Sequence, residues 1–495
     1  MGLRQKLFGL DNQTTQSSKS FEVWQEEDGS IQAYQNGNPL VAGEVNTATG
    51  VISYLAGNAS KNFPAIYGLS LAATDEAVIF DQADDGRFVF TQNDATYGVY
   101  FQQIAIASGT IGSLSKTAIT ASLGTALRNN TGTLIGSLLA RDAWWISPTR
   151  IVFQGSGTGA YASKNFLWIA NYNGSAWTVG NNSPAFDNKY AAVDLGLHGG
   201  GHEVEVKALH HRSLGKKDAS TLLFGEYGIS ATNTSGTNDQ IRVLRSTDGG
   251  ATWSALLTWN TNAGTHEVRH VHAVIYDKHR DKWLICIGDE PYSCVIEWDG
   301  VSAAPPANTA PANFWQYEGW NVYKVNIYGR TGDISLHADS RYYLTDNSEV
   351  DTSEAPMVRL STRHPLIGQK VGDYPRQNGR PALIQCEMPD GGALWASMSE
   401  PTDIGADGYR AFDFLYTPDG LTVFRVAKTR ITGSPGAQAA TLNNIAILKG
   451  SGAAQVYVSG ITYKNSRLLP GGLAGTLVMN LVPWNGSVTE INATA

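Results

Sequence analysis

Cysteine and long apolar runs are both scarce in this chain of 495 residues. The three cysteines, Cys286, Cys294 and Cys386, are too few to crosslink a chain of this length. None has the C-x-x-C spacing of a zinc site, so we expect them to be core residues. No apolar run is long enough to span a bilayer, and we therefore expect no membrane insertion.

Charge is also sparse, because only 16% of the residues are charged and the formal net charge is −8. Surfaces that bind nucleic acid cluster Lys and Arg, so we expect no nucleic-acid partner. The N-terminus lacks the apolar stretch of a secretory signal. We expect cytoplasmic synthesis, followed by an intracellular location, by export with a signal already removed, or by assembly into a virus particle.

Glycine and aromatic residues are abundant: the chain has 53 Gly, 21 Tyr and 13 Trp. This composition is typical of short strands, tight turns and aromatic surfaces, and it predicts an all-β fold. Between residues 21 and 45, Asp-Gly and Asn-Gly pairs separate strand-like segments, a pattern that predicts β-hairpins. Residues 126–155 are the best helical candidate, although their Gly and β-branched residues fit a strand meander equally well.

The stretch from residue 241 to 259 contains two strand-like segments around the turn STDGGATW. Ser246 and Asp248 carry short side-chain oxygens that accept backbone N–H groups of a tight turn, and Gly250 can adopt positive φ. Trp253 would fold back under the turn as an apolar plug. We interpret these four residues as a structural clip.

The turn matches the pattern S-x-D-x-G-x-x-W and so resembles the Asp-box, or BNR repeat, of the sialidase-like β-propeller superfamily. The order of features across residues 200–402 is similar to that of uncharacterised BNR proteins and of propeller-type polysaccharide lyases. The resemblance implies a single β-propeller. Because a blade takes about 40–50 residues, we expect about seven blades over residues 21–495. Residues 1–20 would form a leader that docks against a partner.

Histidines crowd the middle of the chain, where eight of the ten lie between His198 and His279. His270 and His272 are separated by one residue on an expected strand, so both should point to the same face about 7 Å apart. The pair could hold a divalent metal, Zn or Ca, if Asp289 or another histidine supplied a third ligand. Alternatively, the two side chains bond to loop backbones.

Tyr227, His270, His272 and Arg269 are the candidate catalytic residues. The resemblance implies that His and Tyr move protons beside a neutralised uronate, as they do in propeller lyases. Arg269 would grip a carboxylate with two hydrogen bonds, or instead pair with a nearby acidic residue. Adjacent residues on a strand face opposite sides, which disfavours a direct pair of Glu226 with Tyr227. A true sialidase is not expected, since no early segment shows its arginine-bearing motif.

Aromatic side chains could offer flat faces to pyranose rings, with polar loops for the hydroxyl groups. Candidates are Trp144, Trp145, Trp315, Tyr317, Trp320, Tyr342 and Tyr343. Most of the tryptophans should nevertheless be core residues. We name Glu226, His210, Trp320 and Tyr342 as candidate substrate-binding residues.

Three functions fit these features. The first is recognition of a polysaccharide or cell-surface glycan by a phage-type tail or virion surface component, whose leader would contact other virion proteins. The second is an enzyme, either a polysaccharide lyase or a glycoside hydrolase, that acts on an acidic polysaccharide. The third is a purely structural assembly module.

Overall fold

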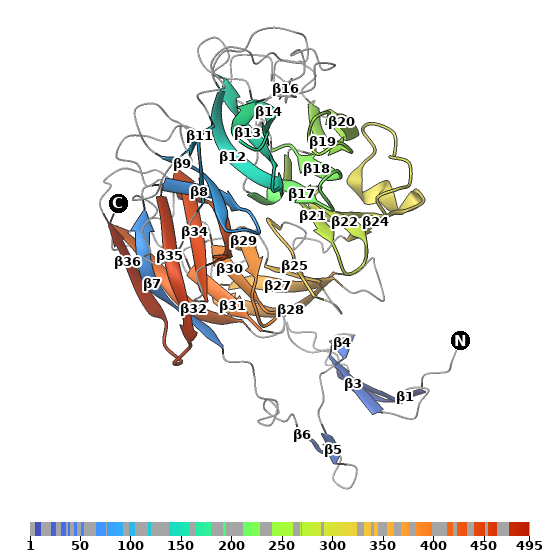
Figure 1. Ribbon diagram of the computed structural model, residues 1–495. Helices are drawn as coiled ribbons and strands as arrows, with labels where there is room; N and C mark the ends of the chain where they lie inside the picture. Colours follow the sequence, from blue (N-terminus) through green and yellow to red (C-terminus); the bar gives the residue numbers. More distant parts are fainter. Residues whose placement is uncertain are drawn as a thin grey trace. The chain divides into compact units, whose positions relative to one another are not determined.

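The computed structural model contains almost only β-strands, which confirms the all-β prediction (Figure 1). It describes residues 5–10, 21–25, 31–35, 38–39, 44–46, 51–53, 66–75, 77–92, 99–103, 117–119, 138–157, 165–179, 192–194, 211–227, 240–260, 268, 270–288, 292–323, 331–337, 341–344, 354–360, 368–375, 382–397, 413–418, 423–432, 440–450, 454–462 and 475–494. The chain divides into two compact units, Met1–Ala65 and Ile66–Ala495.

The first unit contains one antiparallel sheet in the order β1-β2-β3-β4, with strands Gln5–Leu10, Phe21–Gln25, Ile31–Gln35 and Asn38–Pro39. A separate pair is formed by β5 (Glu44–Asn46) and β6 (Val51–Ser53). The expected division after residue 20 lies inside this unit, because β1 pairs with β2.

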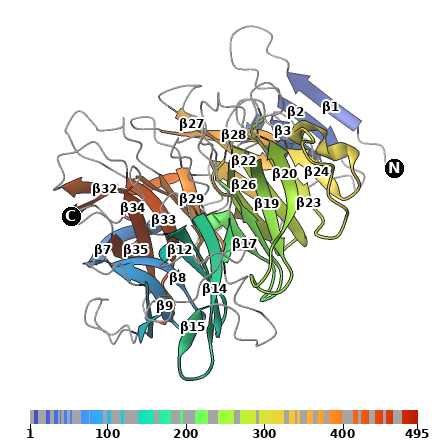
Figure 2. The same ribbon diagram turned by 90° about the horizontal axis from the view of Figure 1, so that it is seen from above.

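The described part of the second unit contains seven sheets, which we number in chain order (Figures 1 and 2). Sheet 1 contains β8 (Ala77–Gln82), β9 (Arg87–Gln92), β10 (Val99–Gln103) and β11 (Thr117–Ala118). Sheet 2 contains β12 (Leu138–Ser147), β13 (Arg150–Gly157), β14 (Asn165–Tyr172), β15 (Trp177–Val179) and β16 (Ala192–Asp194).

Sheet 3 contains β17 (Leu214–Lys216), β18 (Leu222–Gly225), β19 (Gln240–Ser246) and β20 (Ser254–Asn260). Sheet 4 contains β21 (His270–Asp277), β22 (Lys282–Gly288), β23 (Cys294–Trp298) and β24 (Trp320–Tyr323). Two short 3₁₀ helices accompany these sheets: η5 (His211–Ser213) precedes β17, and η6 (Pro311–Gln316) precedes β24.

Sheet 5 contains β25 (Ser335–Leu336), β26 (Arg341–Leu344), β27 (Glu354–Leu360) and β28 (Gly368–Pro375). Sheet 6 contains β29 (Ala382–Glu387), β30 (Ala393–Ser397), β31 (Asp413–Thr417), β32 (Phe424–Thr432) and, parallel to β32, the strand β36 (Thr489–Thr494). Sheet 7 contains β33 (Ala440–Ile447), β34 (Gln455–Thr462), β35 (Gly475–Pro483) and β7 (Tyr67–Asp75).

Sheet 7 joins the first strand of this unit to three strands from its C-terminal part. The first strand β7 pairs antiparallel with β35, so that Tyr67 lies opposite Pro483. In Figure 1 the blue strand β7 accordingly lies beside the red strand β35.

Buried residues that alternate along a strand pack against different neighbouring sheets. In sheet 1, Val78 and Phe80 pack against sheet 2, whereas Ile79 packs against sheet 7. Similar apolar clusters join sheets 2 and 3, sheets 3 and 4, sheets 4, 5 and 6, and sheets 6 and 7. The core is therefore a series of interfaces between sheets.

Candidate functional site

Tyr227, His270 and His272 come together where sheets 3 and 4 meet. Tyr227 lies two residues beyond the end of β18, and it forms an antiparallel bridge with His270, the first residue of β21. The Tyr227 ring stacks on the His270 ring with centroids 4.4 Å apart, and the His270 ring stacks on the His272 ring at 4.9 Å. The result is a three-ring stack of one phenol and two imidazoles.

This stack runs from a partly exposed ring to buried rings. Tyr227 is partly exposed, whereas His270 and His272 are only 6% and 2% exposed. A ligand that approaches the stack from solvent would therefore meet the Tyr227 side chain first.

A β-bulge explains why the two imidazoles are closer than a regular strand would allow. His270 lies opposite Gly288 on β22, and the register shifts between Val271 and Ala273, so His272 is the extra residue. Gly288 gives both rings their space, because a Cβ atom there would lie 2.1 Å from His272 Nε2 and 2.6 Å from His270 Cδ2.

A carbonyl in the segment before β25 determines which nitrogen of His272 carries the proton in the neutral ring. Its Nδ1 lies 3.0 Å from the carbonyl oxygen of Thr331, which can only accept a hydrogen bond. Nδ1 therefore carries the proton, and in the neutral ring the lone pair lies on Nε2. This is the form that a proton acceptor or a metal ligand requires.

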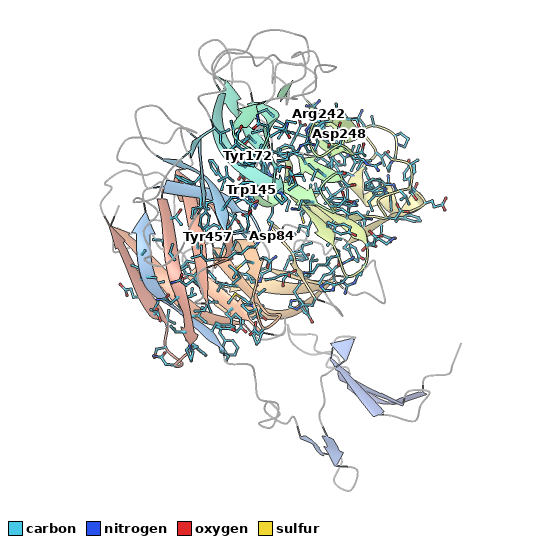
Figure 3. All side chains as sticks on the ribbon, viewed as in Figure 1. Asp84, Trp145, Tyr172, Arg242, Asp248 and Tyr457 are labelled. Carbon is cyan, nitrogen blue, oxygen red and sulfur yellow. The ribbon has the colours of Figure 1, made fainter. Side chains whose placement is uncertain are left out.

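Glu226 precedes Tyr227 in the chain and is fully buried. Its carboxylate accepts hydrogen bonds from the Arg242 backbone N–H at 2.7 Å and from Arg242 Nη2 at 2.6 Å. Its own carbonyl accepts the Val271 N–H at 2.9 Å, which ties sheet 3 to β21. Glu226 thus positions Tyr227 over His270, and its carboxylate faces Arg242, which Figure 3 labels.

The other residues expected from the sequence fall into two groups. Trp320 and Tyr342 are 2% and 3% exposed and belong to the apolar core, where neither ring presents a face to solvent. Arg269, Asp289 and His210 lie outside the described residues. Within the described ranges, His, Cys, Asp and Glu form no group of three that could hold a metal, so the expected third ligand of a metal site is not among them.

The four residues interpreted as a clip, Ser246, Asp248, Gly250 and Trp253, lie at the β19–β20 turn, at the end of sheet 3 opposite the ring stack. Ser246 lies opposite Leu222, whereas the ring stack follows Gly225 at the far end of β18. Ser246 Oγ accepts the Gly250 N–H at 2.8 Å, and Asp248 Oδ1 accepts the Thr252 N–H at 2.9 Å.

The glycine and tryptophan of this turn complete the clip. Gly250 has φ of 87°, and the Trp253 indole N–H donates to its carbonyl at 3.1 Å. The Trp253 ring packs edge-on against Phe224 at 6.5 Å. The turn is also bonded to its surroundings, because Arg150 Nη1 donates to the Asp248 carbonyl at 2.7 Å and the Gly249 N–H donates to the Ser220 carbonyl at 2.9 Å. These contacts fit a structural clip.

One polar node was not foreseen from the sequence. In η5, Arg212 donates to Asp333, which precedes β25, at 3.1 Å and to the carbonyl of Gln385 on β29 of sheet 6 at 3.1 Å. His211 lies 3.2 Å from Asp142 on β12 of sheet 2. Burial raises the pKa of Asp333 despite the opposing charge of Arg212. The only signal in the sequence was the histidine crowding that begins before His211.

Three solved structures compared with the chain are distant likenesses. No family model matches the chain, and no curated protein matches it. Among solved structures, a chain of the mitotic checkpoint complex is 11% identical with a TM-score of 0.38, and the match covers 84% of this chain and 93% of that one.

Two further solved structures are similarly distant. A protein from Lactobacillus plantarum is 10% identical over 86% of this chain and 95% of its own, with a TM-score of 0.39. A functionally unknown protein from Desulfotomaculum acetoxidans is 10% identical over 81% and 98%, with a TM-score of 0.35. Likenesses this distant assign neither a family nor an activity. In the described part of the chain, no helix is long and apolar enough to cross a membrane.

Proposed function

We propose that residues 66–495 form a seven-bladed β-propeller in which each numbered sheet is one blade. Apolar clusters connect each sheet with the next and sheet 7 with sheet 1, as the closure of a ring requires. Strand β7 supplies the outer strand of sheet 7, so the first strand of the unit completes a blade whose other three strands come from the C-terminal part of the chain. Arg212 and His211 of η5, which precedes sheet 3, contact sheet 2, sheet 6 and Asp333 just before sheet 5, which fits a position of η5 near the ring axis.

The function that we propose for this propeller is recognition of an acidic glycan at the Tyr227–His270–His272 stack. The observation that carries it is the stacking of Tyr227 on His270, which places a phenol and two imidazoles at one end of sheets 3 and 4. A phenol O–H and imidazole nitrogens are suited to the hydroxyl and carboxylate groups of an acidic sugar. Arg269, next to His270 in sequence, would pair with the carboxylate.

Cleavage of the same glycan is a second candidate, favoured by the phenol and the imidazoles lying side by side. In a β-elimination, one group removes the proton beside the uronate carboxylate and another protonates the departing glycosidic oxygen. The C–O bond breaks as a C=C bond forms, and no oxidant or water is consumed. The Thr331 carbonyl holds the lone pair of neutral His272 on Nε2, which suits a proton acceptor.

We further propose that the first unit docks this propeller onto a larger particle, such as a phage tail or virion surface. Residues 1–65 form a compact unit of their own with its own four-stranded sheet, as an attachment module would. The glycan would then be a cell-surface receptor. If the protein binds no glycan in the experiment below, the alternative of a purely structural assembly module is favoured instead.

The test uses the purified full chain with a panel of acidic and neutral polysaccharides. Affinity electrophoresis measures binding, and absorbance near 235 nm detects the unsaturated uronate that β-elimination makes. We expect Tyr227→Phe and His270→Ala to weaken binding of an acidic polysaccharide roughly tenfold or more. Binding without product identifies recognition alone, and product that disappears in His270→Ala identifies a lyase.

Lys278→Ala is the matched control, because its exposed side chain pairs with Glu387 and lies at the other end of sheet 4 from His270. Site variants that bind like the wild type, or a wild type that binds no polysaccharide, would overturn the proposed function.

A further inference from the structure

The polar node at η5 lies at the same end of sheet 3 as the ring stack. Leu214, the first residue of β17, pairs with Phe224 on β18, and Tyr227 lies just beyond the end of β18. Because η5 directly precedes Leu214, it lies at the Tyr227 end of the sheet. The helix η5 also contacts β21, which begins at His270. The node therefore lies beside the strand that carries the two imidazoles.

A chain of hydrogen bonds leads from the stack to the node. The His272 Nδ1–H donates to the Thr331 carbonyl oxygen at 3.0 Å. The Thr331 hydroxyl donates to the Asp333 carbonyl oxygen at 2.7 Å, and the Asp333 carboxylate accepts a hydrogen bond from Arg212 Nε at 3.1 Å. Thr331 and Asp333 are both completely buried, so water is not at hand to replace a bond that breaks.

Asp333 anchors this chain of bonds. Its carboxylate also accepts the Ile334 N–H at 2.8 Å and the Gln385 N–H at 3.1 Å, and Arg212 donates a second hydrogen bond to the Gln385 carbonyl. Asp333 is thus held by its own segment, by sheet 6 and by η5. A shift of the Thr331 carbonyl away from His272 would strain bonds between buried groups, which are costly to leave unmade.

We propose that Arg212 and Asp333 are positioning residues of the candidate site. They hold the Thr331 carbonyl against His272 Nδ1 and so keep the lone pair of the neutral imidazole on Nε2. The hydrogen bond at one ring nitrogen decides which tautomer is present. If the carbonyl moved away, Nε2 would carry the proton in a larger share of molecules. An Nε2–H group donates a hydrogen bond and accepts none, so those molecules would lack the proton acceptor.

This role deepens the proposed function, and its importance for binding rests on that function. A ligand hydroxyl that donates to His272 Nε2 requires the Nδ1–H tautomer, and so does removal of a proton by the same nitrogen in a β-elimination. Neither Arg212 nor Asp333 has to touch the glycan. A clamp that only ties η5 to sheet 6 through the same bonds would affect stability and leave the tautomer unchanged.

The test measures the tautomer of His272 in the full chain without a ligand, at about pH 8, where an ordinary imidazole is neutral. Long-range ¹H–¹⁵N spectra of protein labelled in its histidines distinguish the nitrogen with the proton from the nitrogen with the lone pair. His272→Gln identifies the signals. Thr331→Val removes the hydroxyl bond to Asp333, and Thr331→Ser keeps it.

We expect Thr331→Val to shift the tautomer ratio toward Nε2–H by roughly fivefold or more, which is the weight of one hydrogen bond. Binding of an acidic polysaccharide should weaken in parallel. Thr331→Ser should retain the wild-type tautomer and binding. Ser459→Ala is the matched control, because the buried Ser459 hydroxyl also donates to a backbone carbonyl, that of Ile79 at 2.6 Å, between sheets 7 and 1. It should lower stability without changing the His272 tautomer.

Arg212→Gln tests the far end of the chain of bonds and should shift the tautomer in the same direction. Arg280→Gln is its matched control. Arg280 also donates to a completely buried carboxylate, that of Asp277 at 2.9 Å, and to a backbone carbonyl, that of His337 at 3.1 Å. It lies between β21 and β22, at the other end of sheet 4 from His270, so the tautomer should stay as in the wild type.

The outcomes separate this inference from the proposed function. A His272 that keeps its proton on Nδ1 in both Thr331→Val and Arg212→Gln, while these variants lose stability, overturns the positioning role and leaves the proposed site standing. A wild-type His272 with its proton on Nε2 also overturns the positioning role. If the wild type binds no polysaccharide, the proposed function fails, and the tautomer ratios alone then support or overturn the positioning role.

Discussion

At the scale of single residues, Gly288 determines whether the two imidazoles can stack. An alanine Cβ would lie 2.1 Å from His272 Nε2, with the bulged backbone of β21 behind the ring. We predict that Gly288→Ala lowers the free energy of unfolding by about 1–3 kcal/mol, as overpacking does, and weakens glycan binding. Urea unfolding and affinity electrophoresis measure the two effects.

Gly68→Ala is the matched control for this substitution. Gly68 also lies in a strand, and its added Cβ would come no closer than 3.3 Å to another atom, in Trp484. It should change stability less and leave binding unchanged. Equal effects of the two substitutions would show that Gly288 has no particular role in seating the imidazoles.

The sequence predicted part of this residue geometry. It predicted that His270 and His272 point to the same face of a strand and that Glu226 and Tyr227 point to opposite sides. In the structure Glu226 accepts a hydrogen bond from Arg242, whereas Tyr227 stacks on His270. The bulge at His272 has no sequence signature, because it depends on where β22 pairs. Nor could the sequence reveal the Thr331 carbonyl, which comes from the segment before β25.

At the scale of elements, the β19–β20 turn depends on Asp248. Its carboxylate accepts hydrogen bonds from the Thr252 N–H and hydroxyl, at 2.9 and 2.6 Å. Burial raises the pKa of Asp248, but the Thr252 and Ser246 bonds outweigh this effect and lower it. We predict that Asp248→Ala costs about 1–3 kcal/mol of stability at pH 7. Thr247→Ala, at an exposed position of the same turn, should cost less than about 0.5 kcal/mol.

Urea unfolding followed by tryptophan fluorescence checks this prediction. The effect of Asp248→Ala should shrink under acid conditions, because a carboxyl with a lowered pKa contributes above its ordinary pKa and loses its contribution as the pH falls. Equal urea unfolding midpoints for Asp248→Ala and Thr247→Ala at pH 7 would contradict a structural role of Asp248 in the β19–β20 turn.

The strands β12 and β13 show why the local pattern of apolar residues does not always identify a strand. The segment considered for a helix, residues 126–155, contains β12 and most of β13. Trp145 packs toward sheet 1 and Trp144 toward sheet 3, so consecutive residues are apolar because both faces of the strand are buried. A strand of this kind lacks the apolar–polar alternation that identifies a half-exposed strand, and sequence alone could not separate it from a helix.

At the scale of the second unit, a buried ion network joins sheets 4 and 5. Arg341 on β26 is 1% exposed; its Nε donates to Asp277 at 2.6 Å, and its Nη1 donates to Glu297 and, at 3.0 Å, to Tyr323. The sequence does not reveal this network, because its members come from four strands that are separated along the chain. Because two buried carboxylates surround the Arg341 guanidinium, the packing of sheet 4 against sheet 5 depends on the positive charge of Arg341.

We predict that Arg341→Met destabilises the protein by about 3–5 kcal/mol at pH 7, because it leaves the buried carboxylates of Asp277 and Glu297 without the cation. Lys278→Met is the control: its pair with Glu387 also joins two sheets, but the side chains are 57% and 44% exposed, so the expected loss is below about 1 kcal/mol. Urea midpoints of the two variants measure the difference.

The same network makes stability depend on pH. Burial opposes ionisation of Asp277, but Arg341 and Arg280 outweigh it and lower the pKa of Asp277 below its ordinary value of 3.8. Its contribution is therefore complete above 3.8 and is lost as the pH falls through the lower folded-state value. Wild type should lose more stability between pH 5 and pH 3 than Asp277→Asn, which has no proton to gain at that position. Parallel pH profiles for these two proteins would mean that the network does not hold sheets 4 and 5 together through the ionised carboxylate.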